Sequence, residues 1–174
     1  MASFRRQNRG TSGNDVLNGT IDNDIEHGGL GNDLMNGGAG DDTLSGDDGN
    51  DNMVGGSGND IEHGGTGNDT EHGNAGNDNL SGDAGNDHLA GDAGNVIMNG
   101  GIGNDIDSGG TGNDNMNGGA GSDVENGDAG NDLMNGGAGN DNENGGIGND
   151  NVNGGLGNDV DNGGAGDEDR KSVV

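Results

Sequence analysis

An aspartate recurs at every ninth residue over most of this chain, and that spacing is the first chemical feature of the sequence. Sixteen aspartates share the same place in a repeat, namely Asp15, Asp24, Asp33, Asp42, Asp51, Asp60, Asp69, Asp78, Asp87, Asp105, Asp114, Asp123, Asp132, Asp141, Asp150 and Asp159. A hard cation that takes roughly six to eight oxygen ligands suits carboxylates combined with backbone carbonyls. Calcium fits this set, whereas zinc and copper favour imidazole or thiolate.

The residues around each aspartate form a nine-residue repeat, clearest at residues 28–36 (Gly-Gly-Leu-Gly-Asn-Asp-Leu-Met-Asn). Counted from Gly10, eighteen copies end at Lys171, and all 46 glycines fall on positions 1, 2 and 4. A flexible linker would scatter its glycines, so this strict phase indicates a repeating structure. Two copies lack an aspartate at position 6 and have Val96 or Glu168 there instead. The first two copies also drift, with Thr11 and Thr20 at position 2, as terminal repeats often do.

The composition restricts how such a chain can fold and what it can bind. Only 24 of the 174 residues are Leu, Ile, Val or Phe, and the formal net charge is −28. This combination is typical of disorder, so folding needs something besides an apolar core. The negative charge repels nucleic acids and anionic lipids and favours cations as partners. The chain has no cysteine, which excludes disulfides and thiolate metal sites, and no stretch is apolar enough to span a membrane.

Backbone chemistry divides the repeat into a predicted six-residue turn and a three-residue strand. Glycines at positions 1, 2 and 4 allow positive φ and close backbone approach, and position 8 is most often Leu, Met or Val. Two copies then make one coil with strands on opposite sides. We expect a basic disordered leader at 1–9, a roll at 10–166 and a frayed charged tail at 167–174.

The repeat resembles the nonapeptide of RTX (hemolysin-type calcium-binding) proteins, Gly-Gly-x-Gly-x-Asp-x-U-x. The resemblance covers residue 10 to about residue 166 and implies an all-β fold, a right-handed parallel β-roll (a β-helix solenoid) of about nine coils. It also implies that a turn and the turn one coil later share each ion. The family's carboxylate ligand then falls on the sixteen aspartates, and carbonyls of positions 1 to 5 complete each shell.

About a dozen Ca²⁺ ions would nearly neutralise the chain, so that folding and metal binding become one event. Val96 borders two of the gaps between coils. We therefore expect the ions that pair it with Asp78 and with Asp114 to be weak or absent.

Position 8 departs from the family pattern. Ten copies carry an apolar residue there, but seven carry an acid: Glu26, Glu62, Glu71, Asp107, Glu125, Glu143 and Asp161. The last four would form one column, and neighbouring carboxylates about 4.8 Å apart would repel by roughly 3 kcal/mol at an effective dielectric near 20. Shared protons, internal cations or an outward flip would each relieve this repulsion. We expect the outward flip, which would turn Ile106, Val124 and Val160 inward.

Position 9 carries asparagine in nine copies and histidine in three. Asparagines one coil apart predict stacked side-chain amides that stiffen the roll. His27, His63 and His72 each follow a glutamate, which raises a zinc site as an alternative. We interpret them as exposed strand ends because they do not share one sheet face at a single coil step, and we expect His88 at the surface.

Several functions are compatible with these features. The leading one is a calcium-binding extracellular β-roll; residues 1–10 contain no Sec-type signal peptide, and the resemblance to RTX proteins implies export by type I secretion. Open strand edges suggest a self-stacking filament, matrix or adhesion protein instead. An ice-binding roll is the third, although threonine occupies position 3 only at Thr66 and Thr111. No nucleophile and base pair stands out, so we expect no enzyme.

Overall fold

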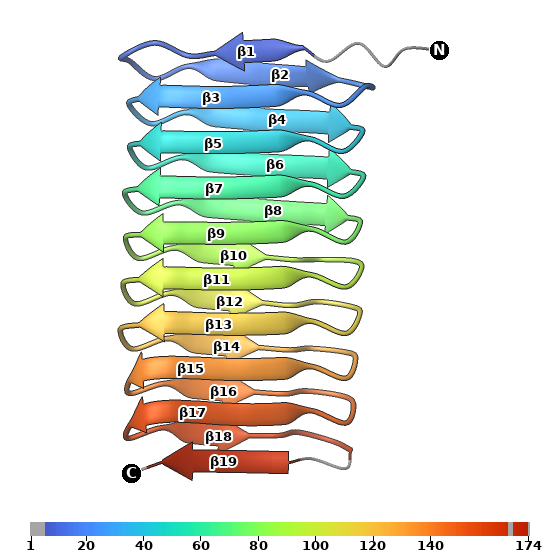
Figure 1. The fold of residues 1–174 in the computed structure, drawn as a ribbon, viewed down its shortest axis with the longest axis vertical. Helices are drawn as coiled ribbons and strands as arrows, with labels where there is room; N and C mark the ends of the chain where they lie inside the picture. The colour runs from blue at the N-terminus through green and yellow to red at the C-terminus, as the bar shows by residue number, and fades with distance from the viewer. Residues whose placement is uncertain (1–5, 167–168, 174) are drawn as a thin grey trace.

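A computed structural model of the chain describes residues 6–166 and 169–173, with side chains up to residue 166. Within these residues the fold is all-β and contains no helix, and the strands stack as a solenoid (Figure 1). Consequently no described helix is long and apolar enough to cross a lipid bilayer.

The strands form two parallel sheets that face each other. One sheet has ten strands, in the spatial order β1 (Gln7–Arg9), β3 (Ile25–Leu30), β5 (Thr43–Asp48), β7 (Ile61–Thr66), β9 (Asn79–Ala84), β11 (Ile97–Ile102), β13 (Asn115–Ala120), β15 (Leu133–Gly139), β17 (Asn151–Gly157) and β19 (Asp169–Val173). The other has nine, β2 (Val16–Thr20), β4 (Leu34–Ala39), β6 (Asn52–Ser57), β8 (Thr70–Ala75), β10 (His88–Ala90), β12 (Ile106–Ser108), β14 (Val124–Asn126), β16 (Asn142–Asn144) and β18 (Val160–Asn162).

Two repeats make one coil, as the sequence predicts. Met98 of β11 pairs with Met116 of β13, and Met116 pairs with Met134 of β15. Each step is therefore one coil of eighteen residues, and equivalent positions form straight columns along the solenoid. The predicted parallel β-roll of about nine coils is confirmed.

The strands are longer than the pattern predicts over much of the roll. The strands β3 to β9, β11 and β13 span six residues, from position 7 through the glycines to position 3, whereas β10, β12, β14, β16 and β18 span three. The strand pairing continues through the glycines at positions 1 and 2, and the chain bends sharply at position 4. There Gly31 has φ 114°, a value that side chains with a Cβ rarely adopt.

The core is one row of side chains, mainly from position 8, that lies between the two sheets. One buried apolar cluster holds Met35, Leu44 and Met53, and a second runs from Leu80 to Val152. Between them lie the buried carboxyl groups of Glu62 and Glu71. The apolar core is therefore narrow and interrupted by acids.

The described residues near each end of the chain form strands, where the sequence predicts a disordered leader and a frayed tail. Gln7–Arg9 form β1 and pair with β3, so the expected disordered leader is wrong for these residues, which occupy positions 7 to 9 of an additional half-coil. Likewise, Asp169–Val173 form β19 and pair with β17 through an irregularity between Asn153 and Gly155, where a frayed tail was expected. Residues 1–5, 167, 168 and 174, and therefore Glu168, lie outside the described residues.

Candidate metal sites

One oxygen of each position-6 carboxylate holds the backbone of the neighbouring coil. The Asp33 N–H donates to Asp51 Oδ1 at 2.7 Å, and the Asp51 N–H donates to Asp69 Oδ1 at 2.8 Å. The same bond recurs between most neighbouring coils, up to Asp141 and Asp159. It explains why a chain of aspartates can be buried, since Asp33, Asp51 and Asp69 are each no more than 3% exposed.

The second oxygen of these carboxylates is buried without a partner. Among the described residues, Oδ2 has no hydrogen bond in Asp33, Asp42, Asp51, Asp60, Asp69, Asp78, Asp87, Asp105, Asp114, Asp123, Asp132, Asp141, Asp150 and Asp159. An unpaired buried carboxylate oxygen is costly. Fourteen of the sixteen predicted ligands therefore present an unsatisfied oxygen inside the turns.

Each unpartnered oxygen faces the position-1 glycine of its own repeat. A Cβ placed on Gly37 would lie 2.6 Å from Asp42 Oδ2 and 2.7 Å from the carbonyl oxygen of Gly55, which belongs to the next coil. We call this space, bounded by the glycine, the carboxylate and the carbonyl, the cradle of the repeat. It combines oxygens from two coils, and it exists because position 1 has no side chain.

The carboxylates of these cradles are hard to ionise without a counterion. Burial raises the pKa of Asp51 and of Asp60 to about 6 although a backbone N–H lowers it, and aspartates of adjacent coils raise it further. Burial likewise raises the pKa of Asp87 to about 7. An all-oxygen site with a carboxylate that needs neutralising suits a hard divalent cation.

Side-chain ligands alone do not complete such a site. Over the described part of the chain there is no group of three or more His, Cys, Asp or Glu residues that could hold a metal ion. Backbone carbonyls must therefore supply most of the oxygens, as the resemblance implies. Such a donor set fits calcium and does not fit zinc or copper.

The first two repeats differ from the others. Asp15 Oδ2 accepts hydrogen bonds from the Thr11 N–H at 2.6 Å and from the Thr11 hydroxyl at 2.9 Å. Asp24 Oδ2 accepts the same two bonds from Thr20, also at 2.6 and 2.9 Å. The threonines that depart from the repeat thus satisfy the oxygen that is unpartnered in later coils.

Val96 keeps the backbone bond of position 6 and loses the carboxylate. Its N–H donates to Asp114 Oδ1 at 2.8 Å, and its Cγ2 would lie 3.0 Å from a Cβ on Gly91. A methyl group therefore stands where other repeats have Oδ2. Asp78, one coil earlier, still presents Oδ2 to its own glycine, Gly73, so the carboxylate is missing from one cradle.

The position-8 acids point inward, and the expected outward flip is wrong. Asp107, Glu125 and Glu143 are at most 1% exposed, and both carboxylate oxygens of Asp161 are buried without a partner. The residues that a flip would bury remain on the surface, since Ile106, Val124 and Val160 are 49%, 41% and 62% exposed. The register that places each position-6 aspartate in its turn fixes position 8 on the inner face.

The buried acids behave as weak acids. Burial raises the pKa of Asp107 and of Glu125 to about 8. The charges of Asp105 and Asp123 raise the pKa of Asp107 further, and those of Asp107 and Asp123 do the same for Glu125. Burial also raises the pKa of Glu143, and the adjacent Asp161 raises it further. Of the alternatives considered for this column, shared protons and internal cations remain.

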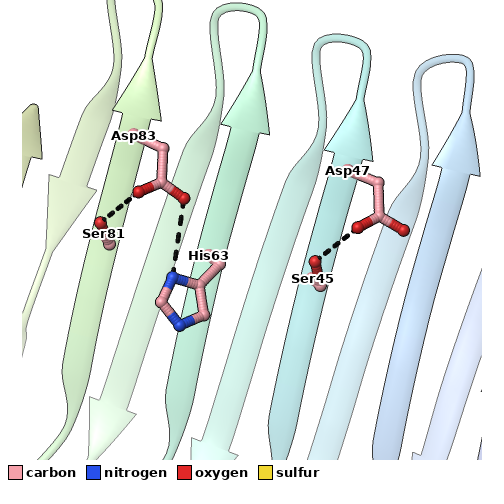
Figure 2. Close-up of polar contacts among 5 residues, drawn as sticks. All are labelled: Ser45, Asp47, His63, Ser81 and Asp83. Atoms are coloured by element: carbon pink, nitrogen blue, oxygen red, sulfur yellow. Dashed lines mark hydrogen bonds and ion pairs between the residues drawn. The ribbon is translucent and has the colours of Figure 1, made fainter. Parts of the chain in front are cut away.

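The histidines lie outside the roll, away from their neighbouring glutamates. His63 is 48% exposed and its Nδ1 is 3.6 Å from Asp83 Oδ2, whereas Glu62 is fully buried. Figure 2 shows His63 and Ser81 converging on Asp83, with the Ser81 hydroxyl 2.9 Å from Asp83 Oδ1. Alternation along the strand sends Glu and His to opposite faces, so they cannot share a zinc ion. His88 is exposed, as predicted.

The contacts between histidine and aspartate on the outer face follow a regular spacing that the sequence analysis does not predict. His27, His63 and His72 each lie within 3.7 Å of an aspartate at position 2 of a repeat in the next coil, namely Asp47, Asp83 and Asp92. Those aspartates occupy a left-handed conformation, with φ between 65° and 71°, which Asp and Asn tolerate better than other residues. The spacing of twenty residues between each pair was the available signal.

Two ladders of asparagines reinforce the coils. The predicted position-9 ladder is confirmed, because the Nδ2 groups of Asn117, Asn135 and Asn153 donate to the preceding asparagine at 2.7, 2.7 and 2.6 Å. A second ladder at position 5 was not predicted. There a side-chain oxygen accepts the backbone N–H of the next coil, as in Asn50 N–H to Asn32 Oδ1 at 3.0 Å.

Fold and site together define a parallel β-roll whose turns carry buried, unpartnered carboxylate oxygens beside backbone carbonyls. A family model of the RTX calcium-binding nonapeptide repeat, four copies long, matches residues 9–25, 27–62, 63–98, 72–107 and 108–143. The chain therefore belongs to the RTX calcium-binding repeat family, and calcium binding is implied by that membership. A comparison with curated proteins gave no match.

Proposed function

We propose that this chain is a calcium-responsive β-roll that folds as its turns bind multiple Ca²⁺ ions and that acts outside the cell as a structural or secretion module. The observation that supports this most is the column of buried Oδ2 atoms without partners. The proposed ligands are the fourteen repeat aspartates whose Oδ2 has no partner, whereas Thr11 and Thr20 already satisfy that oxygen in Asp15 and Asp24. Bound calcium would supply the positive charge that neutralises these carboxylates.

The residues of each cradle divide the work. The position-6 Oδ1 fixes the spacing between coils through a backbone N–H, while Oδ2 and the carbonyl of the next coil face the same space. In a calcium-poor cytoplasm the carboxylates repel one another and the chain stays unfolded. Outside the cell, where calcium is abundant, binding and folding occur together, which suits export by type I secretion. No catalytic role is assigned.

A calcium titration followed by circular dichroism tests this function. We expect β-structure to appear at millimolar calcium and not at the same concentration of magnesium, because Mg²⁺ requires a smaller octahedral shell and dehydrates reluctantly. Sodium chloride at matched ionic strength controls for charge screening. An unchanged spectrum in calcium would refute the proposal.

A matched pair of variants locates the binding. Asp51→Asn keeps an oxygen for the Asp33 N–H but removes the charge from the cradle, so the calcium concentration at half-folding should rise several-fold. Asp15→Asn is the control, because Thr11 already satisfies Asp15 Oδ2. Equal shifts in the two variants would argue against cradle binding.

End-to-end association is a second candidate, favoured by the strand edges. In the described structure, β2 and β18 end the nine-stranded sheet, and β18 presents the exposed side chain of Val160. Unpaired edges accept further strands, so a second copy could continue the stack. Light scattering against protein concentration in calcium tests this, and Val160→Lys should reduce any association. Scattering that stays monomeric at all concentrations would exclude it.

A further inference from the structure

Two of the position-8 glutamates reach the cradles. Glu62 is fully buried, and neither of its carboxylate oxygens has a hydrogen-bond partner. A Cβ placed on Gly55 would lie 2.6 Å from Asp60 Oδ2 and 2.7 Å from Glu62 Oε1. The carboxylates of positions 6 and 8 of this repeat therefore face the same glycine.

The same arrangement occurs at Glu143, closer to the C-terminal end of the roll. Glu143 is fully buried, and its Oε1 is the atom nearest to a Cβ placed on Gly136, while Asp141 Oδ2 lies 2.8 Å from that point. Both oxygens of Glu143 and the Oδ2 of Asp141 lack hydrogen-bond partners. Two separate cradles thus contain a pair of unsatisfied carboxylates.

Burial alone does not produce this geometry, as Glu71 shows. Glu71 is also fully buried and unpartnered, and it belongs to the repeat directly after that of Glu62. The atoms nearest to a Cβ on its own glycine, Gly64, are Asp69 Oδ2 at 2.5 Å, the carbonyl oxygen of Gly82 at 2.8 Å and Asp69 Cβ at 3.0 Å. The Glu71 carboxylate is not among them.

Charge makes the paired cradles unstable without a cation. Glu62 is buried among the acidic residues Glu71, Asp60 and Asp78, whose charges act on its carboxylate. Asp60 and Asp78 are the position-6 residues of the two coils that border the cradle. Calcium affinity rises with the number of carboxylates around the ion, so a cation beside Asp60 would also attract Glu62.

We propose that Glu62 and Glu143 are calcium ligands, each adding a second carboxylate to the cradle of its own repeat. The inference rests on the proposed calcium binding and extends it to a position that ordinarily fills the core. These two cradles then hold calcium more tightly than cradles with one carboxylate. Binding would also remove two of the uncompensated acids from the interior.

The matched variants Glu62→Gln and Glu71→Gln test this proposal in the full chain. Each removes one buried, unpaired charge, which by itself favours the folded state and lowers the calcium concentration at half-folding. If Glu62 is a ligand, Glu62→Gln instead raises that concentration several-fold and lowers the affinity of one site in a calorimetric titration. Glu71→Gln should leave it unchanged or lower it. Equal effects of the two variants would overturn the proposal.

A crystal structure of the calcium-loaded chain gives an independent readout that does not depend on stability. We expect the carboxylates of Asp60 and Glu62 to share an ion, at calcium–oxygen distances of about 2.3–2.6 Å. An ion bound by Asp60 with the Glu62 carboxylate turned away would disprove the added ligand while leaving the proposed function intact. Absence of calcium from every cradle would overturn both.

Discussion

At position 6, the two oxygens of one side chain have separate roles. In Asp51, Oδ1 accepts the Asp33 N–H at 2.7 Å, and Oδ2 is left without a partner. Val96 separates these roles naturally, because its backbone keeps the bond to Asp114 and its side chain joins the apolar cluster. The roll therefore tolerates the loss of one carboxylate without a break in coil spacing.

Val96→Asp should restore the missing cradle. We expect the calcium-loaded variant to bind one more ion per chain than the parent, measured by equilibrium dialysis. Without calcium the variant should be less stable by about 1–3 kcal/mol, because a polar group replaces a buried methyl pair. Val96→Asn is the control, since it adds an oxygen without the charge. An ion count that does not change in Val96→Asp would show that Oδ2 is not a ligand.

Among the elements, β1 acts as a cap that continues the repeat. Asn8 occupies position 8 and its Nδ2 donates to Glu26 Oε1 at 2.6 Å, while the Arg6 N–H donates to Asp24 Oδ1 at 3.1 Å. Arg6 thus stands where other half-coils have the position-6 carboxylate. With Thr20 on Asp24 Oδ2, both oxygens of Asp24 and one oxygen of Glu26 have protein donors, while Glu26 Oε2 has none.

Removal of residues 1–9 should therefore destabilise the roll, although a disordered leader would have been dispensable. The deletion strips the donors from Glu26 and Asp24 and exposes the edge of β3, and an unsatisfied buried acceptor costs about 1–3 kcal/mol. We expect a lower melting temperature in calcium, measured by circular dichroism. Deletion of residues 1–5 is the matched control because it keeps Arg6 and Asn8. Equal melting temperatures for both deletions would mean that β1 does not cap the roll.

The elements also show how far the sequence could predict this fold. The period, two repeats per coil and the inward position 8 follow from glycine phase and apolar spacing, and they are confirmed. The inward orientation of the position-8 acids is not predicted from the sequence, because repulsion between neighbouring carboxylates favours the outward flip and the bonds that hold each turn are not visible there. In most repeats the position-6 carboxylate is bonded across coils, and this fixes the register of position 8.

The sequence predicts where the cradles lie along the chain, but it does not predict which side chains contact one another inside them. The frame alone identified the aspartates, but it could not show that Thr11 and Thr20 satisfy two of them or that Glu62 faces Gly55. Those contacts depend on side-chain rotamers in a packed interior. The half-coil at Gln7–Arg9 was missed because it carries the phase of the repeat without its glycines.

Over the whole molecule, positive charge is confined to the two ends. The five basic residues are Arg5, Arg6, Arg9, Arg170 and Lys171, so no lysine or arginine lies between residues 10 and 169. The buried acids of the roll therefore have no internal cation to pair with. Protons or external cations must therefore neutralise them.

The calcium-free roll should consequently lose stability as the pH rises. Burial raises the folded-state pKa of Asp107, Glu125 and Glu71 to about 8, against about 4 in an unfolded chain. Between about pH 4 and pH 8 the folded chain thus binds more protons, so the free energy of unfolding falls as the pH increases and levels off above that range. The growing net negative charge acts in the same direction.

Circular dichroism in the presence of a calcium chelator, repeated between about pH 3 and pH 9, measures this dependence as the fraction of folded chain. We expect β-structure at acid pH that is lost as the pH rises, and the loss should occur at a higher pH in Glu125→Gln, which removes one raised pKa. In saturating calcium the dependence should reverse, because the position-6 carboxylates bind the ion only when deprotonated. A folded fraction that rises with pH in the absence of calcium would mean that these acids are paired or solvated in solution.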